Sequence, residues 1–411
     1  METQEKAERV ILVGVQTTEA DYSFSYSLKE LEQLTETAQG IVVGQITQKR
    51  SRADSRTYLG KGKVEELLQL VEELEADTVI FNHELTPAQT RNIQDAVDTK
   101  VIDRVQLILD IFAMHAKSKE GKLQVELAQL QYLLPRLAGQ GVNLSRLGGG
   151  IGTRGPGETK LETDRRYIRN QITDIRRELA ETEKHRARTR KQRQESNIFQ
   201  IGLIGYTNAG KSTLLNKLTD AGTYEENKLF ATLDPLTRQL KLPSGLNVTI
   251  TDTVGFIQDL PTQLIEAFHS TLEETRGVDL LLHVVDASAE NMLEHERTVT
   301  NLLIDLEMDH LPLLTIYNKS DLITEPFYPD YFPNIVMSAR NEADVDLLLD
   351  QLMEKIEEIM EPYRLEVPVD EGDMLIQLKQ ETQVATQIYD EEKNVYVVKG
   401  YAKAKSKWIG E

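Results

Sequence analysis

The sequence of 411 residues predicts an α/β protein with more than one domain. Short β-rich runs alternate with segments of helical period in two parts of the chain, a pattern typical of parallel sheets covered by helices. A glycine-rich loop joins one of these runs, Ile198–Ile204, directly to a helical segment. Between the two α/β parts, leucine and isoleucine recur at heptad spacing, which indicates paired helices.

Composition limits the function classes. The net charge of −20 argues against a general polyanion binder unless the basic residues are segregated. The sequence has no cysteine, which excludes disulfides and thiolate metal sites, and its seven histidines show no metal-binding spacing. There is no signal peptide, and no apolar run approaches the roughly 18 residues of a membrane span. We therefore expect a cytoplasmic protein with no membrane span.

Residues 1–118 are expected to form a small parallel α/β domain. Its four β-rich runs are Val10–Val15, Gly40–Ile46, Thr78–Phe81 and Lys100–Ile102. Within this domain, Leu59–Lys63 places two glycines beside two lysines. Two interpretations stay open: a helix N-terminus that uses glycine for its turn, or a second contact with a nucleotide or RNA phosphate.

Residues 119–196 are expected to form an antiparallel coiled-coil hairpin. Each arm carries an apolar seam: Leu123, Leu127, Leu130, Leu134 and Leu137 on the first, and Leu161, Ile168, Ile172, Ile175 and Leu179 on the second, where Arg165 interrupts the seam. The tip, residues 139–157, holds eight glycines, two arginines and no acidic residue. The sequence therefore predicts a hairpin with a basic, glycine-rich tip.

Cations are concentrated on this hairpin. Residues 135–195 carry 15 Lys and Arg against eight Asp and Glu, in a protein that is acidic elsewhere. Such an arm suits a phosphate backbone, and the scarcity of aromatic residues argues against base stacking. We predict contacts with folded RNA, although a solvated helix face is the alternative. The residues predicted to contact RNA are Arg146, Arg154, Arg186, Arg188, Arg190, Lys191 and Arg193.

Residues 197–362 contain the glycine-rich loop, Gly205–Thr213, which matches the spacing Gly-x4-Gly-Lys-Ser/Thr. Backbone N–H groups of such a loop surround a polyphosphate at the start of a helix. Lys211 then reaches the β and γ oxygens, and Ser212 supplies a hydroxyl ligand to Mg²⁺. The loop therefore predicts a nucleoside triphosphate site.

Two later segments complete the phosphate end of this site. Asp252–Gly255 follows the β-rich run Leu246–Thr251, so that Asp252 can hold Mg²⁺ through water and the Gly255 amide can contact the γ-phosphate. Phe230–Asp234 lies between this segment and the glycine-rich loop, and Thr232 is its candidate Mg²⁺ ligand. We predict Lys211, Thr232 and Gly255 as the catalytic groups.

The base is selected by Asn318–Asp321. The Asp321 carboxylate can accept two hydrogen bonds from N1 and the exocyclic amine of guanine, a donor pair that adenine does not offer. Ser338–Arg340 is placed for contact with the guanine O6. We therefore predict binding of GTP and GDP. The predicted nucleotide-binding residues are Gly205, Tyr206, Thr207, Asn208, Ala209, Gly210, Lys211, Ser212, Phe230, Ala231, Thr232, Leu233, Asp234, Asp252, Thr253, Val254, Gly255, Asn318, Lys319, Ser320, Asp321, Ser338, Ala339 and Arg340.

Residues 363–411 mix one amphipathic stretch with β-rich pieces and are expected to form a small α+β domain. The complete fold prediction is thus a P-loop GTPase domain preceded by a small parallel α/β domain and an antiparallel helical hairpin, and followed by this α+β domain.

The motifs Gly205–Ser212, Phe230–Asp234, Asp252–Phe256 and Asn318–Asp321, together with Ser338–Arg340, resemble those of the Obg–HflX group of GTPases. Leu59–Lys63, the heptad hairpin and Gly148–Glu158 resemble the HflX family in particular. The resemblance implies a GTPase that binds the large (50S) ribosomal subunit and its 23S rRNA, separates stalled or idle ribosomes and directs its hairpin toward the peptidyl-transferase centre. We expect a monomer away from the ribosome.

Three questions stay open. Asn208 resembles the K⁺-binding asparagine of cation-stimulated GTPases, but an asparagine that fixes the loop by hydrogen bonds is the alternative. Phe256 stands where Ras-like enzymes carry the glutamine that orients water, so we expect slow hydrolysis by the free protein. The alternative function is a nucleotide-gated scaffold or chaperone that binds proteins through its coiled coil.

Overall fold

A computed structural model describes residues 7–18, 21–137, 156–195, 198–219, 229–230, 236–253, 255–257, 275–324 and 326–409. The side chains of 21–22, 156–161, 183 and 185–195 are outside this description. The chain divides into two compact units, one mainly of residues 1–182 and one mainly of residues 183–411. The predicted α/β class is confirmed. None of the described helices is long and apolar enough to cross a membrane.

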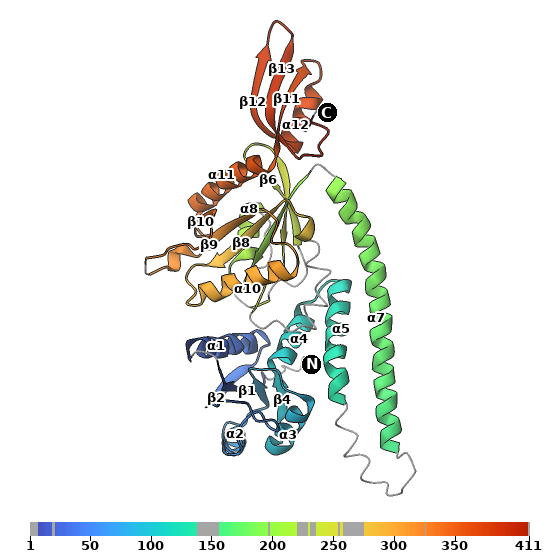
Figure 1. Ribbon diagram of the computed structural model, residues 1–411, viewed down its shortest axis with the longest axis vertical. Helices are drawn as coiled ribbons and strands as arrows, with labels where there is room; N and C mark the ends of the chain where they lie inside the picture. The colour runs from blue at the N-terminus through green and yellow to red at the C-terminus, as the bar shows by residue number, and fades with distance from the viewer. Residues whose placement is uncertain are drawn as a thin grey trace, which may run out of the picture. The chain divides into compact units, whose positions relative to one another are not determined.

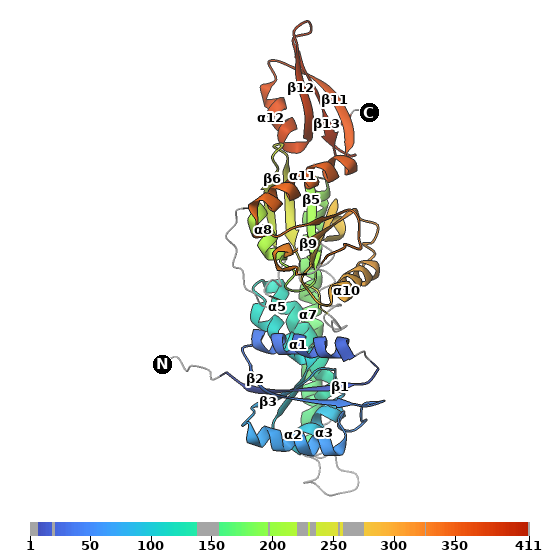
Figure 2. The same ribbon diagram turned by 90° about the vertical axis from the view of Figure 1, so that its left-hand side faces the viewer.

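The first unit begins with a parallel sheet of order β2-β1-β3-β4. Its strands are β1 (Arg9–Gln16), β2 (Ile41–Lys49), β3 (Thr78–Phe81) and β4 (Lys100–Asp103). The helices are α1 (Asp21–Thr37), α2 (Lys61–Glu73), α3 (Pro87–Val97) and α4 (Arg104–His115). Figure 2 shows α1 on one side of this sheet and α2 and α3 on the other. Helices therefore cover both faces, as crossover connections between parallel strands require.

Local sequence signals explain where these helices begin. Thr86 and Gln89 form a capping box before α3, with Pro87 as the first helical residue. Gly60, in the Leu59–Lys63 segment, caps α2 in an extended conformation. A Cβ there would lie 2.8 Å from the Arg50 guanidinium, the flexible end of a long side chain, so this contact alone does not require glycine. The segment does begin a helix, as the turn interpretation expects, and phosphate binding by it is not tested.

A buried carboxylate, Asp103, joins the sheet to the hairpin. It accepts hydrogen bonds from the backbone N–H groups of Leu85 and Gln106, at 2.9 and 3.0 Å. The Tyr132 hydroxyl donates to it at 2.8 Å, and the Arg136 guanidinium lies 3.2 Å away. Asp103 therefore caps α4 and at the same time fixes the end of the next helix.

The hairpin consists of α5 (Lys119–Arg136) and α7 (Pro156–Glu195), which lie side by side (Figure 1). Leu127 of α5 packs with Ile168, Ile172 and Ile175 of α7, and the flanking leucines extend this seam. The predicted heptad pairing is thus present in the described residues. The predicted tip and its arginines, Arg146 and Arg154, lie outside them.

The second unit contains a six-stranded sheet of order β10-β9-β8-β5-β7-β6, in which only β6 is antiparallel to its neighbour. Its strands are β5 (Phe199–Gly205), β6 (Leu236–Lys241), β7 (Asn247–Asp252), β8 (Leu280–Asp286), β9 (Leu313–Asn318) and β10 (Asn334–Val336). Its principal helices are α8 (Lys211–Thr219), α10 (Met292–Asp305) and α11 (Glu342–Ile359), with short helical turns η2 (Thr275–Gly277) and η3 (Ser320–Leu322). Apolar side chains of α8 and α11 pack on one face, and those of α10 pack on the other.

A three-stranded antiparallel sheet closes the chain. It comprises β11 (Glu361–Pro368), β12 (Gln383–Asp390) and β13 (Val395–Ala402), with α12 (Gly372–Glu381). The expected boundary at residue 362 falls inside β11, because this strand begins at Glu361, directly after Met360 caps α11. Since β11 lies at the sheet edge, Pro362 is tolerated there.

Removing the Asp103 carboxylate should weaken the first unit. Asp103→Ala leaves the buried Tyr132 hydroxyl without its acceptor and removes one ion-pair partner of the Arg136 guanidinium, which together cost about 3 kcal/mol. We expect hydrogen exchange of the β4 and α5 amides to accelerate roughly 100-fold, as mass spectrometry can measure. Asp95→Ala, at an exposed position of α3, is the matched control. Unchanged exchange in Asp103→Ala would show that this carboxylate is not the connection.

Candidate nucleotide-binding site

The predicted phosphate and base motifs meet at one edge of the six-stranded sheet. Gly205, Asp252 and Asn318 are the last residues of β5, β7 and β9, and Ser338 follows β10 closely. These four strands run parallel, so their carboxyl ends lie at the same edge. Ligands of open α/β sheets bind at this edge.

Both motif glycines of the phosphate loop are required by close contacts. Gly205 has a φ of 152°, and a Cβ on it would lie 2.1 Å from the Val284 carbonyl oxygen. Gly210 has a φ of 98°, and its Cβ would lie 2.2 Å from the Asn318 amide nitrogen. A side chain at either position would displace backbone or the base-recognition loop. The loop conformation thus follows directly from the Gly-x4-Gly spacing.

Lys211, the first residue of α8, is buried at the centre of the loop. Its ammonium donates to the carbonyl oxygens of Gly205 and Tyr206, at 3.0 and 2.8 Å. Burial lowers the pKa of Lys211 to about 8, although the nearby Asp252 carboxylate acts in the opposite direction. A polyphosphate would supply the anionic charge that this buried ammonium lacks.

Ser212 and Asp252 are together, as predicted for a magnesium site. The Ser212 hydroxyl donates to the Asp252 carboxylate at 2.8 Å. One hydroxyl and one carboxylate are the oxygen donors that Mg²⁺ accepts beside phosphate oxygens and water. The two side chains therefore fit the ion, which would neutralise charge on the β and γ phosphates when bound. The second predicted ligand, Thr232, lies outside the described residues together with Ala231, Leu233, Asp234 and Val254.

The segment after β7 is hydrogen-bonded to the phosphate loop. Thr207 N–H donates to the Phe256 carbonyl oxygen at 2.6 Å, and Phe256 N–H donates to that of Gly205 at 3.1 Å. A Cβ on Gly255 would lie 2.8 Å from the Thr207 methyl group and 3.2 Å from the Lys211 ammonium. Gly255 is thus within reach of the position expected for a γ-phosphate. The Thr253 hydroxyl instead donates to the Leu203 carbonyl oxygen, a structural bond.

The predicted base-recognition residues line a pocket of about 380 Å³. Its lining combines Asn208 and Gly210 with Asn318–Asp321 and Ser338–Arg340. The Asn318 side chain donates to the Ala209 carbonyl oxygen and accepts from the Ala339 N–H, both at 2.9 Å. Asn318 therefore holds the phosphate loop and the Ser338–Arg340 loop together.

Asp321 is exposed at the rim of this pocket. The Ser338 hydroxyl donates to its carboxylate at 2.6 Å and lowers the pKa of Asp321. The carboxylate therefore stays ionised and can accept hydrogen bonds from a ligand in this pocket. Asn208 is also exposed, with a left-handed φ of 60°, so its amide is accessible to a ligand.

The structure also places residues that sequence reasoning missed. The Lys319 ammonium pairs with Asp286 at 2.6 Å, and Asp286 is the last residue of β8. Asp286 could have been predicted from the sequence, because it is a carboxylate at the end of a buried apolar strand. The Tyr206 ring stacks on His295 of α10, with centroids 3.8 Å apart, so that Tyr206 faces the protein interior. No spacing in the sequence indicated this pair, and burial lowers the pKa of His295 to about 4.

Phe230, one of the predicted nucleotide-binding residues, belongs to the first compact unit. Its ring is buried and lies against Phe112 of α4, with ring centroids 4.5 Å apart. An apolar aromatic ring is stabilised by such burial, and the Phe-Ala-Thr-Leu-Asp motif gave no indication of this contact.

Comparison with known proteins decides the family. Three family models match consecutive parts of the chain: "GTP-binding GTPase N-terminal" over residues 25–113, "GTP-binding GTPase Middle Region" over residues 115–193 and "50S ribosome-binding GTPase" over residues 200–319. The GTPase HflX of Alkalihalophilus pseudofirmus is 56% identical over 400 residues, which are 97% of this chain and 95% of that protein. The chain belongs to the HflX family of GTPases.

More distant HflX proteins cover most of the chain as well. The GTPase HflX of Caldanaerobacter subterraneus is 49% identical over 384 residues, 93% of this chain and 89% of that protein. The GTPase HflX of Escherichia coli is 42% identical over 352 residues, 84% and 82% of the two chains. The family resemblance and the prediction of a GTP-hydrolysing enzyme are therefore confirmed.

The depressed pKa of Lys211 predicts a pH dependence of nucleotide binding by this HflX family member. Below pH 8 the ammonium is mostly charged before binding, whereas above pH 8 the nucleotide must bind together with a proton. We expect the Kd for GDP to rise between pH 8 and 9, by up to about tenfold per pH unit. Titration calorimetry in several buffers measures both the Kd and the proton uptake. Lys211→Met should bind weakly and lack this rise. An identical rise in this variant would assign the effect to another group.

Base selection can be tested at Asp321. Asp321→Asn replaces an acceptor-only carboxylate with a carboxamide that can donate to the xanthine carbonyl. We expect GTP affinity to fall at least tenfold, about 1.4 kcal/mol, while affinity for xanthosine triphosphate rises. Equilibrium titration with both nucleotides measures the exchange. Unchanged GTP affinity would mean that another residue reads the base.

Proposed function

We propose that this GTPase binds the large (50S) ribosomal subunit in the cytoplasm, contacts 23S rRNA through its hairpin and separates stalled or idle ribosomes. The match of residues 200–319 to the "50S ribosome-binding GTPase" model carries the proposal. The HflX relatives over most of the chain support it. The protein would act as a monomer away from the ribosome.

The hairpin supplies a surface of suitable charge. Helix α7 continues without interruption for 40 residues to Glu195, and its final part carries Arg186, Arg188, Arg190, Lys191 and Arg193. The concentrated positive charge of this helix is opposite in sign to an RNA backbone. The rival function, a scaffold that binds proteins through the coiled coil, is opposed by the seam itself. Leu127, Ile168 and Ile172 are buried against each other and are not available to a partner.

Lys211, Ser212, Thr232 and Gly255 are the residues to which we assign phosphate and Mg²⁺ binding. The Phe256 side chain cannot assist the attacking water, because its ring is buried in an apolar cluster with Ile204 and Leu281. A group supplied by the ribosomal partner would then complete the transition state, and such groups are worth about 10³ to 10⁵ in rate. The Asn208 amide is a proposed K⁺ ligand. Hydrolysis in K⁺ and Na⁺ at equal ionic strength distinguishes it from a structural asparagine.

Neutralising the arm should abolish its salt-dependent attachment to the subunit. Each lost phosphate contact lowers the slope of log K against log salt by about 0.7 to 0.9. Changing the five arm cations named above to glutamine should therefore weaken binding to purified 50S subunits strongly at low salt. The matched control changes five exposed lysines of the C-terminal sheet region to glutamine: Lys379, Lys393, Lys399, Lys405 and Lys407.

The same variants distinguish the two functions by kinetics. Single-turnover GTP hydrolysis should be slow in the free protein and accelerated by 50S subunits in the wild type and the lysine control, but not in the arm variant. Fast hydrolysis without subunits would contradict the argument from Phe256. Equal binding and stimulation of both variants would favour the scaffold.

A further inference from the structure

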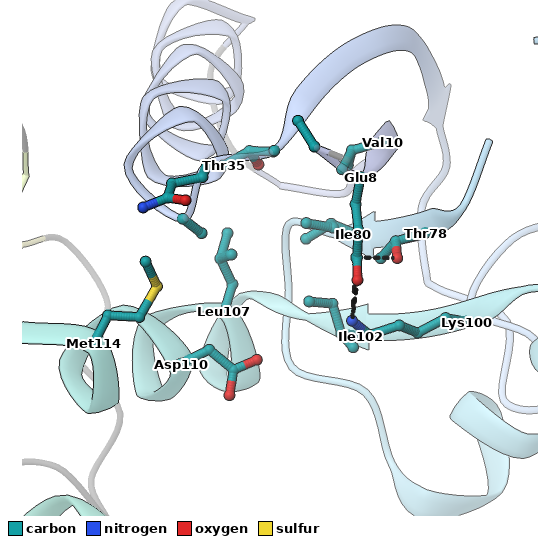
Figure 3. A pocket seen from close by; sticks show the side chains of 14 residues that line it. Glu8, Val10, Thr35, Thr78, Ile80, Lys100, Ile102, Leu107, Asp110 and Met114 are labelled. Atoms are coloured by element: carbon teal, nitrogen blue, oxygen red, sulfur yellow. Dashed lines mark hydrogen bonds and ion pairs between the residues drawn. The ribbon is translucent and has the colours of Figure 1, made fainter. Parts of the chain in front are cut away.

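A second pocket, of about 520 Å³, lies in the first unit (Figure 3). It is formed where the chain enters the parallel sheet: Glu8 precedes β1, Thr78 opens β3 and Lys100 opens β4. This edge is opposite to the carboxyl ends of the strands. Its volume is within the range of about 300 to 1,000 Å³ that is usual for small-molecule sites.

One acid of this pocket is already satisfied. Both Glu8 carboxylate oxygens lie 3.1 Å from the Lys100 ammonium, and the Thr78 hydroxyl donates to one of them at 2.7 Å. Figure 3 shows these contacts as dashed lines. The Thr78 hydrogen bond, followed by Lys100, lowers the pKa of Glu8. The only lysine of the lining is therefore neutralised by Glu8.

The second acid, Asp110, has no such partner. It projects from α4, and Figure 3 shows its carboxylate turned toward the space beside Ile102. Within the described ranges no Lys, Arg or His forms an ion pair with it, and Gln129 is its side-chain hydrogen-bond partner. Burial raises the pKa of Asp110 although the charge of Lys100 acts in the opposite direction, so the ionised carboxylate is poorly solvated here.

The end of α1 adds to the negative potential. Thr35, Ala38, Gln39 and Gly40 line the pocket, so the C-terminal turn of α1 faces it. Helix C-termini carry about half a negative elementary charge, and α1 has no basic residue in its last turn. A cation in the pocket would therefore meet both Asp110 and this helix end.

The remaining wall is apolar. Val10, Ile80, Ile102, Leu107 and Met114 line it, and Met114 is half exposed at the rim. Methionine adapts to ligands of different shape. A ligand that fills this pocket must thus bury hydrocarbon as well as charge. A bare metal ion does not fit this wall, and the described part of the chain has no cluster of three or more metal-ligating side chains.

We propose that this pocket binds a small organic cation, an ammonium group on a short aliphatic chain. The ammonium pairs with Asp110 beside the C-terminal end of α1, and the chain lies on Leu107, Ile102 and Met114. An organic anion is excluded by the same charges. A neutral ligand of equal shape would bury the chain but leave the Asp110 carboxylate unpaired.

The test uses the full-length protein and three six-carbon probes: n-hexylammonium, 1-hexanol and hexanoate. Labelling the methionine methyl groups with ¹³C gives an NMR reporter in the pocket, Met114, whose signal is assigned by its loss in Met114→Leu. We expect n-hexylammonium to shift this signal and to bind at least tenfold more tightly than 1-hexanol, with no binding of hexanoate. Equal affinities for the three probes, or an unmoved Met114 signal at millimolar concentrations, would overturn the proposal.

Two variants locate the charge. Asp110→Asn should lower the affinity for n-hexylammonium about tenfold and remove its preference over 1-hexanol, while Asp95→Asn on the exposed side of α3 should change neither. Met114→Lys places an ammonium at the pocket rim, where a half-exposed side chain tolerates the change, and should prevent binding in calorimetry. Hydrogen exchange of the β1, β3 and β4 amides at the wild-type rate verifies that the first unit of each variant is folded. An ammonium preference that survives in Asp110→Asn would refute the assigned contact.

Discussion

The Asn318 side chain is the interaction on which the nucleotide site depends. It is buried, and its amide group connects the carbonyl oxygen of Ala209 to the N–H of Ala339. The phosphate loop and the two base-recognition loops come from different strand ends, and this one side chain fixes their separation. The same contact explains Gly210, since any side chain there would collide with the Asn318 amide. Loss of Asn318 would release both halves of the site together.

Much of this site could be predicted from sequence because its motifs constrain the backbone locally. Few arrangements around a polyphosphate satisfy this combination of residues. It comprises the two glycines of the phosphate loop, the lysine and hydroxyl at the start of α8, and the aspartate at the end of β7. The strands were equally readable, since buried parallel strands are continuous apolar runs. Strand β6 was missed because its exposed edge position leaves an ambiguous pattern, Leu-Thr-Arg-Gln-Leu-Lys.

Contacts between distant parts of the chain were not readable. The pairing of Lys319 with Asp286 and the stacking of Tyr206 on His295 depend on which strands and helices become neighbours. The same holds for the Asp103 hydrogen bonds, which join residues up to 33 positions apart. The Glu8–Thr78–Lys100 group is formed by the starts of three strands, so only the sheet order β2-β1-β3-β4 brings it together. A single sequence records none of these long-range neighbours.

The protein has one tryptophan, Trp408, and the surroundings of this side chain determine what intrinsic fluorescence measures. The indole is buried against the three-stranded sheet, donates to Glu381 at 2.9 Å and lies beneath the Lys407 ammonium at 4.5 Å. Its emission therefore follows the polarity of that small sheet. A fluorescence melting curve therefore reports on the unit that contains this sheet, and the parallel sheet of the first unit can remain folded or unfold unseen.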